Sequence, residues 1–129
     1  FKEFLKIYSG NPKVHILGYV NDTDLVTVTN LAEVALFPSF AEGFGLPIIE
    51  AQACGVPVVA SKTQALVEIA GDSCLFFDPN NIQNIKDILL EVLENKKIKS
   101  ELIKKGNQNH KKYFWKKVAQ ETIKIYQNL

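Results

Sequence analysis

Short apolar runs alternate with amphipathic stretches along this chain of 129 residues. A continuous apolar run of strand length is typical of a buried strand, whereas apolar residues three and four apart indicate a helix with one buried side. Alternation of the two predicts an α/β fold, an open parallel sheet with helices on both faces, ending in several helices. The predicted strands are 14–17, 34–37, 56–60 and 74–77, and the predicted helices are 1–8, 22–31, 46–54, 64–71, 82–93, 98–112 and 115–127.

The segment 38–61 carries the most chemical information. Gly43 and Gly45 allow a sharp backbone turn and close approach of a ligand, and Pro47 suits the first turn of a helix because its φ is already helical. Gly55 suits the left-handed residue that ends such a helix. The free amides and the positive dipole end of the helix would then face the loop, which is an arrangement that binds phosphate.

Two carboxylates lie in this segment, Glu42 in the loop and Glu50 about one turn into the helix, so both could face one ligand. Carboxylates accept paired hydrogen bonds from vicinal hydroxyls, which are abundant in sugars and riboses. In the ordinary alternative, Glu50 complements the helix dipole and Glu42 is a solvated charge. Ser39 and Glu42 also match a capping box, but the glycines that follow oppose a helix there.

The run EGFGLPIIEAQACGVPVVAS resembles the signature of the retaining, nucleotide-sugar-dependent glycosyltransferases of family 4, also called group 1, which have the two-domain GT-B fold. Glu42 and Glu50 match the E-x7-E pair of that family. The resemblance extends from His15–Val20 through Phe77–Pro79 to Phe114–Trp115, which is nearly the whole chain. It implies the C-terminal, donor-binding half of a GT-B enzyme, with a Rossmann-like sheet.

The resemblance also implies roles for particular residues. Backbone amides of the loop would contact the phosphate and sugar of the donor, Glu50 would bind ribose hydroxyls, and Glu42, the catalytic candidate, would orient the transferred sugar. The backbone near Tyr19 and Val20 would lie by the nucleotide base. Neither a metal nor a cofactor is expected, and the reaction would be hexosyl transfer with retention. The expected donor-binding residues are Gly43, Phe44, Gly45, Leu46, Glu50, Tyr19 and Val20.

Parts of the resembled enzyme have no counterpart in this sequence. The donor domain of the family begins with further strands, whose loops carry an arginine and a lysine that grip the diphosphate, and the sequence contains no arginine. We therefore expect residues 1–129 to be one nucleotide-sugar-binding domain that is inactive alone. Its expected partners are a nucleotide-sugar donor, a carbohydrate or lipid-linked acceptor, and the N-terminal acceptor domain of a parent chain.

Composition agrees with a globular domain, at 47% apolar and 22% charged residues. No apolar stretch reaches membrane-spanning length, and the first ten residues are too densely charged for a secretory leader, so a cytoplasmic location is expected. Cys54 and Cys74 lack a C-x-x-C spacing and sit in or beside apolar elements, which predicts core thiols rather than a metal site or a disulfide.

Charge is unevenly distributed, although the formal net charge is only +1. Residues 95–129 hold ten lysines and only two acids, for a net +8, whereas residues 1–94 carry a net −7. A solvated helix face accounts for such lysines, and an anionic membrane surface, with peripheral attachment at the inner membrane face, is the alternative. No nucleic acid partner is expected, because the lysines accompany neither interleaved aromatics nor a known reading motif.

Two other motifs point elsewhere and are interpreted conservatively. Asp22 and Asp24 form a D-x-D, which binds a divalent cation in the other large glycosyltransferase fold, but Asn21 or Asp22 followed by Leu25 is typical of a helix N-cap. Gly43 and Gly45 resemble part of a dinucleotide fingerprint. The third glycine is replaced by Ile48, so an oxidoreductase is only an alternative, as are a non-enzymatic basic membrane-docking module and a phosphorylase of the same fold.

Overall fold

A parallel sheet forms the centre of the molecule in the computed structural model, which describes residues 2–8 and 10–128. Its three strands have the order β1 (Ala35–Phe37), β2 (Val58–Ser61) and β3 (Cys74–Phe77). Ala35 pairs with Val58, and Val58 pairs with Cys74 on its other side. Successive strands that run parallel need a helical crossover between them, so the predicted α/β fold with an open parallel sheet is confirmed.

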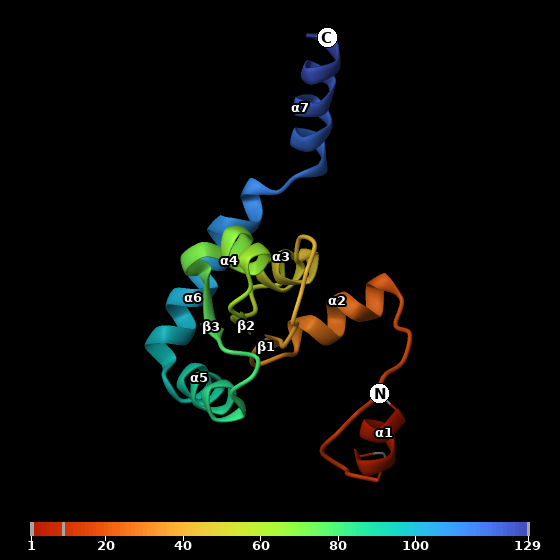
Figure 1. Ribbon diagram of the computed structural model, residues 1–129, viewed down its shortest axis with the longest axis vertical. Helices are drawn as coiled ribbons and strands as arrows, with labels where there is room; N and C mark the ends of the chain where they lie inside the picture. Colours follow the sequence, from red (N-terminus) through yellow and green to blue (C-terminus); the bar gives the residue numbers. More distant parts are fainter. Residues whose placement is uncertain (1, 9, 129) are drawn as a thin grey trace.

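Helices cover both faces of this sheet (Figure 1). The helices α3 and α4 pack on one face, and α5 and α6 pack on the other. The described helices are α1 (Lys2–Tyr8), α2 (Asp22–Asn30), α3 (Leu46–Ala53), α4 (Gln64–Ala70), α5 (Ile82–Glu94), α6 (Lys96–Asn109) and α7 (Trp115–Gln127), with 3-10 turns η1 (Gly71–Ser73) and η2 (His110–Lys112). No helix of the described chain is both long enough and apolar enough to cross a membrane.

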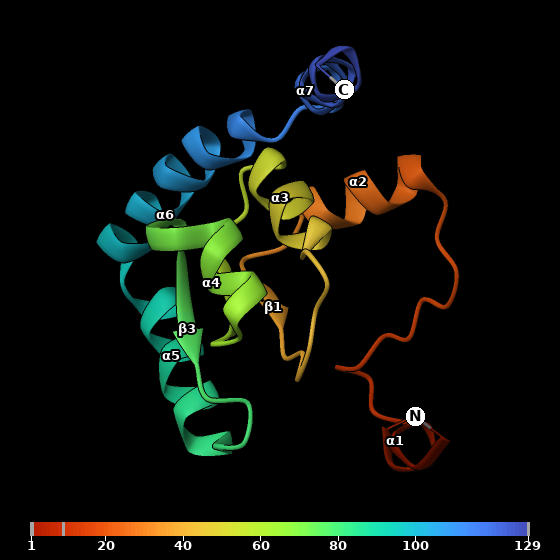
Figure 2. The same ribbon diagram turned by 45° about the horizontal axis from the view of Figure 1, so that its top comes forward.

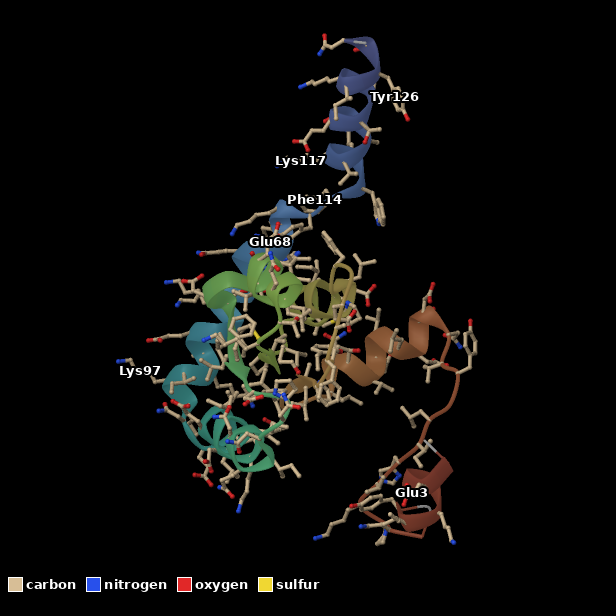
Figure 3. All side chains as sticks on the ribbon, viewed as in Figure 1. Glu3, Glu68, Lys97, Phe114, Lys117 and Tyr126 are labelled. Atoms are coloured by element: carbon tan, nitrogen blue, oxygen red, sulfur yellow. The ribbon has the colours of Figure 1, made fainter. Side chains whose placement is uncertain are left out.

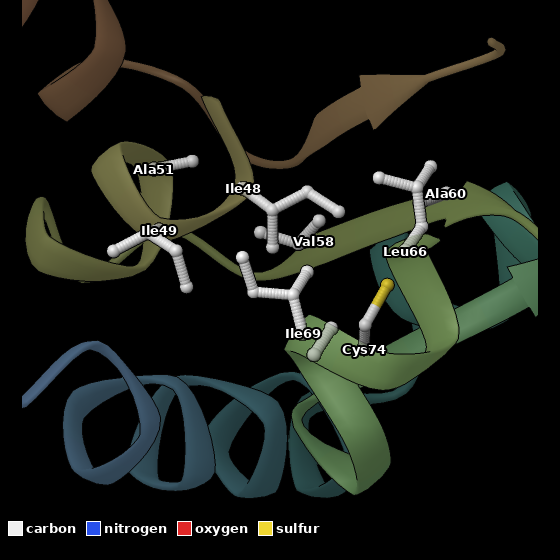
Figure 4. Close-up of a cluster of buried hydrophobic side chains, with 9 residues drawn as sticks. Ile48, Ile49, Ala51, Val58, Ala60, Leu66, Ile69 and Cys74 are labelled. Atoms are coloured by element: carbon white, nitrogen blue, oxygen red, sulfur yellow. The ribbon is translucent and has the colours of Figure 1, made fainter. Parts of the chain in front are cut away.

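The core on the first face joins α3 and α4 to the strands (Figure 4). Ile48 from α3 and Leu66 from α4 are each 1% exposed and pack with Val58 and Cys74. Burial raises the pKa of the Cys74 thiol to about 12, which keeps it protonated and unreactive at neutral pH. Cys54 and Cys74 are both free; Cys74 is buried, as predicted for a core thiol, whereas Cys54 is only partly buried.

The core on the second face is assembled from β2, β3, α5 and α6. Val59, Phe77, Val92 and Leu102 are its buried members. Each side chain of this kind contributes about 1.5–3 kcal/mol when it is fully removed from water. The two cores together explain why the apolar positions of 82–93 and 98–112 follow a helical period: one side of each helix faces the sheet or its neighbour.

The predicted strand at 14–17 is wrong. In the described chain these residues join no sheet, and Ile16 and Leu17 are 41% and 56% exposed. They belong to the connection between α1 and α2, which lies to one side of the sheet (Figure 2). A strand exists only where a neighbour supplies its ladder hydrogen bonds, and an apolar run cannot by itself provide one.

Candidate functional site

The loop between β1 and α3 ends at Gly45, which is the N-cap of α3. Its φ of 99° is left-handed, and a Cβ at this buried position would lie 2.6 Å from Cδ2 of Leu66. The left-handed backbone therefore favours glycine, and a Cβ would also force the buried Leu66 side chain to move. Because Gly45 has no side chain, no side chain caps the first turn of α3, whose amides and positive dipole end face the loop. The predicted start of this helix at Leu46 is confirmed.

Glu42 is held by a neighbour in the same loop. The Ser39 hydroxyl donates a hydrogen bond of 2.6 Å to Oε1 of Glu42; Glu42 is exposed, and Ser39 is partly buried. A short bond to an ionised carboxylate is among the stronger hydrogen bonds in proteins. Since α3 begins only at Leu46, the pair is not a capping box. Ser39 instead orients the carboxylate toward solvent, where a ligand could reach it.

Gly43 and Phe44 line a small pocket of about 140 Å³ on the α4 side of the loop. The Phe44 ring meets the Tyr113 ring edge to face, with centroids 5.9 Å apart and planes at 86°. The remaining lining residues are Ala65, Glu68 and Ile69 of α4. Leu46, also in the predicted set, is exposed at the start of α3.

Glu50 lies on a different side of α3, in a groove of about 640 Å³ between α2 and α3. Ala35 and Phe37 of β1 contribute to the wall of this groove, which is mostly apolar, while Asp22 and Glu50 are its two carboxylates. Glu42, Gly43 and Phe44 are not among the lining residues of this groove. The structure thus places Gly43 and Phe44 on one small pocket and Glu50 on a neighbouring groove.

Tyr19 and Val20 lie in the connection that precedes α2. The Tyr19 side chain is 94% exposed, and Val20 is partly buried. Neither residue lines the small pocket or the groove. Their predicted place beside a nucleotide base stays a prediction.

The D-x-D at the start of α2 belongs to a helix cap. The Asn21 side chain accepts a hydrogen bond of 3.0 Å from the Asp24 amide and donates one of 2.8 Å to the Asp24 carboxylate. The predicted N-cap at Asn21 is confirmed. Among residues 2–8 and 10–128, no three His, Cys, Asp or Glu side chains gather closely enough to hold a metal ion.

A buried polar network behind the loop was not predicted from the sequence. Gln52 donates 2.7 Å to the Ser73 hydroxyl and accepts 2.9 Å from Asn109, which also donates 2.9 Å to the Ile69 carbonyl. All three side chains are nearly inaccessible to solvent. The network joins α3, η1 and the end of α6, and thereby fixes the helix that begins at the loop. Polar Gln52 in a helix whose other residues, apart from Glu50, are apolar was the available signal.

Known protein families and sequences match this chain over most of its length. Residues 1–109 match the family model described as glycosyl transferases group 1. The chain is 39% identical over 116 residues to O-antigen chain mannosyltransferase B of Escherichia coli, and 32% identical over 118 residues to the MMP alpha-(1->4)-mannosyltransferase of Mycolicibacterium hassiacum. These matches cover 90% and 88% of this chain.

A solved structure shares the fold. Sucrose-phosphate synthase from Thermosynechococcus elongatus superimposes with a TM-score of 0.85 at 26% identity, over 98% of this chain and 33% of that one. The chain likewise spans 30% of the Escherichia coli relative and 29% of the Mycolicibacterium hassiacum relative. Residues 1–129 therefore correspond to about a third of each of these proteins.

Proposed function

The chain belongs to the group 1 glycosyl transferases, and on that premise we propose that it holds the nucleotide-sugar donor of a retaining hexosyl transfer. The observation that carries the proposal is the start of α3 at Gly45, where no side chain makes a cap hydrogen bond, with Glu42 before it and Glu50 after it. A helix start of this kind offers backbone amides and a positive dipole to a diphosphate without using a side chain.

Each residue then has a chemical task. Amides from Gly43 to Leu46 bind the donor diphosphate and stabilise the charge that develops as it departs. Glu42, oriented by Ser39, accepts hydrogen bonds from the transferred sugar, and Glu50 accepts them from the ribose. The bond between the anomeric carbon and the phosphate oxygen breaks, the acceptor oxygen bonds to that carbon on the same face, and its proton goes to the leaving phosphate. This route requires neither a protein nucleophile nor a metal.

The remainder of the reaction is assigned to parts outside residues 1–129. Because the chain spans about a third of its relatives, we propose that an N-terminal domain binds the carbohydrate or lipid-linked acceptor, and that residues 1–129 alone do not catalyse transfer. Two relatives are named as mannosyltransferases, so mannosyl donors are the first to test. Activity that survives EDTA is expected. A strict requirement for manganese or magnesium would contradict the metal-free route.

Calorimetric titration of UDP, GDP and ADP into the full protein tests donor binding. We expect one diphosphate to bind, and Glu50→Gln to weaken that binding about tenfold or more, because hydrogen bonds to a charged carboxylate contribute about 1.5–3 kcal/mol. Glu91→Gln, an exposed carboxylate on α5, is the matched control and should leave affinity unchanged. Unchanged affinity in Glu50→Gln would overturn the ribose assignment, and absence of binding by all three diphosphates would overturn donor binding.

A second candidate, attachment to an anionic membrane, rests on the C-terminal lysines and on α7. No residue of α7 is buried, and Trp115 and Tyr126 at its two ends are largely exposed. Such aromatics favour a membrane interface, and lysines favour anionic lipid. Binding to phosphatidylglycerol vesicles that is lost at high salt would support attachment. Binding that does not depend on lipid charge, or no binding at all, would overturn the proposed attachment.

A further inference from the structure

Tyr113 connects two parts of the molecule that are distant in sequence. It follows η2 and lies beyond residue 109, where the family match ends. Its amide donates 3.1 Å to the His110 carbonyl, and its half-buried side chain packs against the core formed by α3 and α4. The chain therefore returns from the end of α6 to the loop between β1 and α3 at this residue.

The two ends of the Tyr113 side chain make separate contacts. The hydroxyl donates 3.0 Å to the Ile69 carbonyl of α4, while the ring packs edge to face on Phe44. The Ile69 carbonyl also accepts 2.9 Å from Asn109, so it keeps a hydrogen bond if the tyrosine hydroxyl is removed. The hydroxyl thus adds a bond to α4, whereas the ring, which is also packed on the core, is the part of Tyr113 that contacts the loop.

Phe44 is the residue through which the loop can be held. It lies between Gly43 and Gly45, and glycine restricts the backbone least of all residues. A glycine-rich loop is better ordered when one of its side chains is held by another part of the molecule. Without such a contact, ordering the loop on ligand binding would cost conformational entropy. The Phe44 ring is about half exposed, and its edge-to-face contact is with Tyr113.

We propose that Tyr113 is a positioning residue for the donor: its ring holds Phe44 and so sets the loop amides from Gly43 to Leu46 for the diphosphate. This inference rests on the proposed donor-binding function. Tyr113 itself lines the pocket beside the loop with Gly43 and Phe44 and has no assigned chemical step. Its contribution is preorganisation, in which the loop amides already point to where the phosphate will sit.

The test uses the full protein and the diphosphate that binds it among UDP, GDP and ADP. Tyr113→Leu removes the ring, and we expect the Kd to rise about threefold to tenfold, the range that corresponds to an edge-to-face aromatic pair. Tyr113→Phe keeps the ring, so the Kd should stay within about twofold of wild type while the Tm falls slightly from loss of the hydroxyl bond. Amide hydrogen exchange at residues 43–46 without ligand should accelerate in Tyr113→Leu only.

A double-mutant cycle with Phe44→Leu completes the test. If Tyr113 acts through Phe44, the double variant Tyr113→Leu/Phe44→Leu should bind no more weakly than the weaker single variant. If the wild type binds a diphosphate and Tyr113→Leu binds it with the same Kd, the inference about Tyr113 is overturned while the donor-binding function is retained. Equal weakening in Tyr113→Phe and Tyr113→Leu, or additive losses in the cycle, would also overturn it. If wild type binds none of the three diphosphates, the donor-binding function fails, and this inference with it.

Discussion

The helices α5 and α7 have the same length and a similar alternation of apolar and polar residues, yet α5 packs on the body of the molecule and α7 is exposed to solvent. Each has thirteen residues. In α5, Val92 is fully buried, and the apolar side of the helix packs on β3 and α6. In α7, no residue is buried. The helix extends away from the body, at the opposite end from α1 (Figure 1). Lys117 and Tyr126 lie on it, farther from the body than Phe114 (Figure 3).

The difference shows what an amphipathic pattern can specify. The pattern determines which side of a helix would be buried, and only a partner surface determines whether it is buried. For α5 that surface is built within the chain, by strands and a helix that lie inside the family match at 1–109. For α7 the described chain supplies no covering element, and α7 lies beyond that match.

The largest expected effect separates the two helices by stability. Phe77, under α5, is 1% exposed, and Phe77→Ala should lower the free energy of unfolding by about 3–5 kcal/mol through lost burial and the cavity left behind. Tyr126→Ala in α7, where the side chain is 73% exposed, should change it by about 0.5 kcal/mol or less. Urea unfolding followed by circular dichroism measures both. A Tyr126→Ala loss comparable with that of Phe77→Ala would mean that the apolar side of α7 is covered in solution.

The elements that the sequence predicted well are those defined by local information. The start of α3 could be located because Gly45 permits the left-handed backbone before the helix and the fixed φ of Pro47 suits its first turn. The strand predicted at 14–17 failed because pairing is non-local, and apolar character indicates only a preference for burial. The alternation of helices with strands, in contrast, was sufficient to predict a parallel sheet with two covered faces.

The same distinction between local and non-local information applies to the candidate site. Glu42 and the loop glycines could be selected from spacing, since their chemistry depends on neighbours in the sequence. Gln52 could not be given partners, because Ser73 and Asn109 lie 21 and 57 residues away. The contact of Tyr113 with Phe44 was missed for the same reason. Whether Glu42 and Glu50 act on one ligand stays a prediction, to be tested by donor titration.

A smaller effect on stability is expected from changing the N-cap residues, at which α5 and α7 also differ. Asn81 caps α5, and its side chain accepts 3.0 Å from the Asn84 amide. Asn81→Ala should lower the free energy of unfolding by about 1 kcal/mol, because that amide loses its partner. Asn81→Ser keeps an acceptor at the position and should lose much less, so equal losses in both variants would indicate an effect unrelated to capping. Urea unfolding again provides the measurement.

The smallest effect is expected where a cap is added to α7. Phe114 is the N-cap of α7 and makes no side-chain cap bond, although its extended backbone, with φ −113° and ψ 130°, is suitable for one. Phe114→Asn supplies an acceptor for a first-turn amide. Hydrogen exchange of the first amides of α7 should slow severalfold, while the global free energy of unfolding changes by about 0.5 kcal/mol or less, because α7 buries nothing on the body. Global stabilisation equal in size to the loss in Asn81→Ala would show instead that α7 unfolds together with the sheet, and the two helices would then differ in exposure but not in cooperativity.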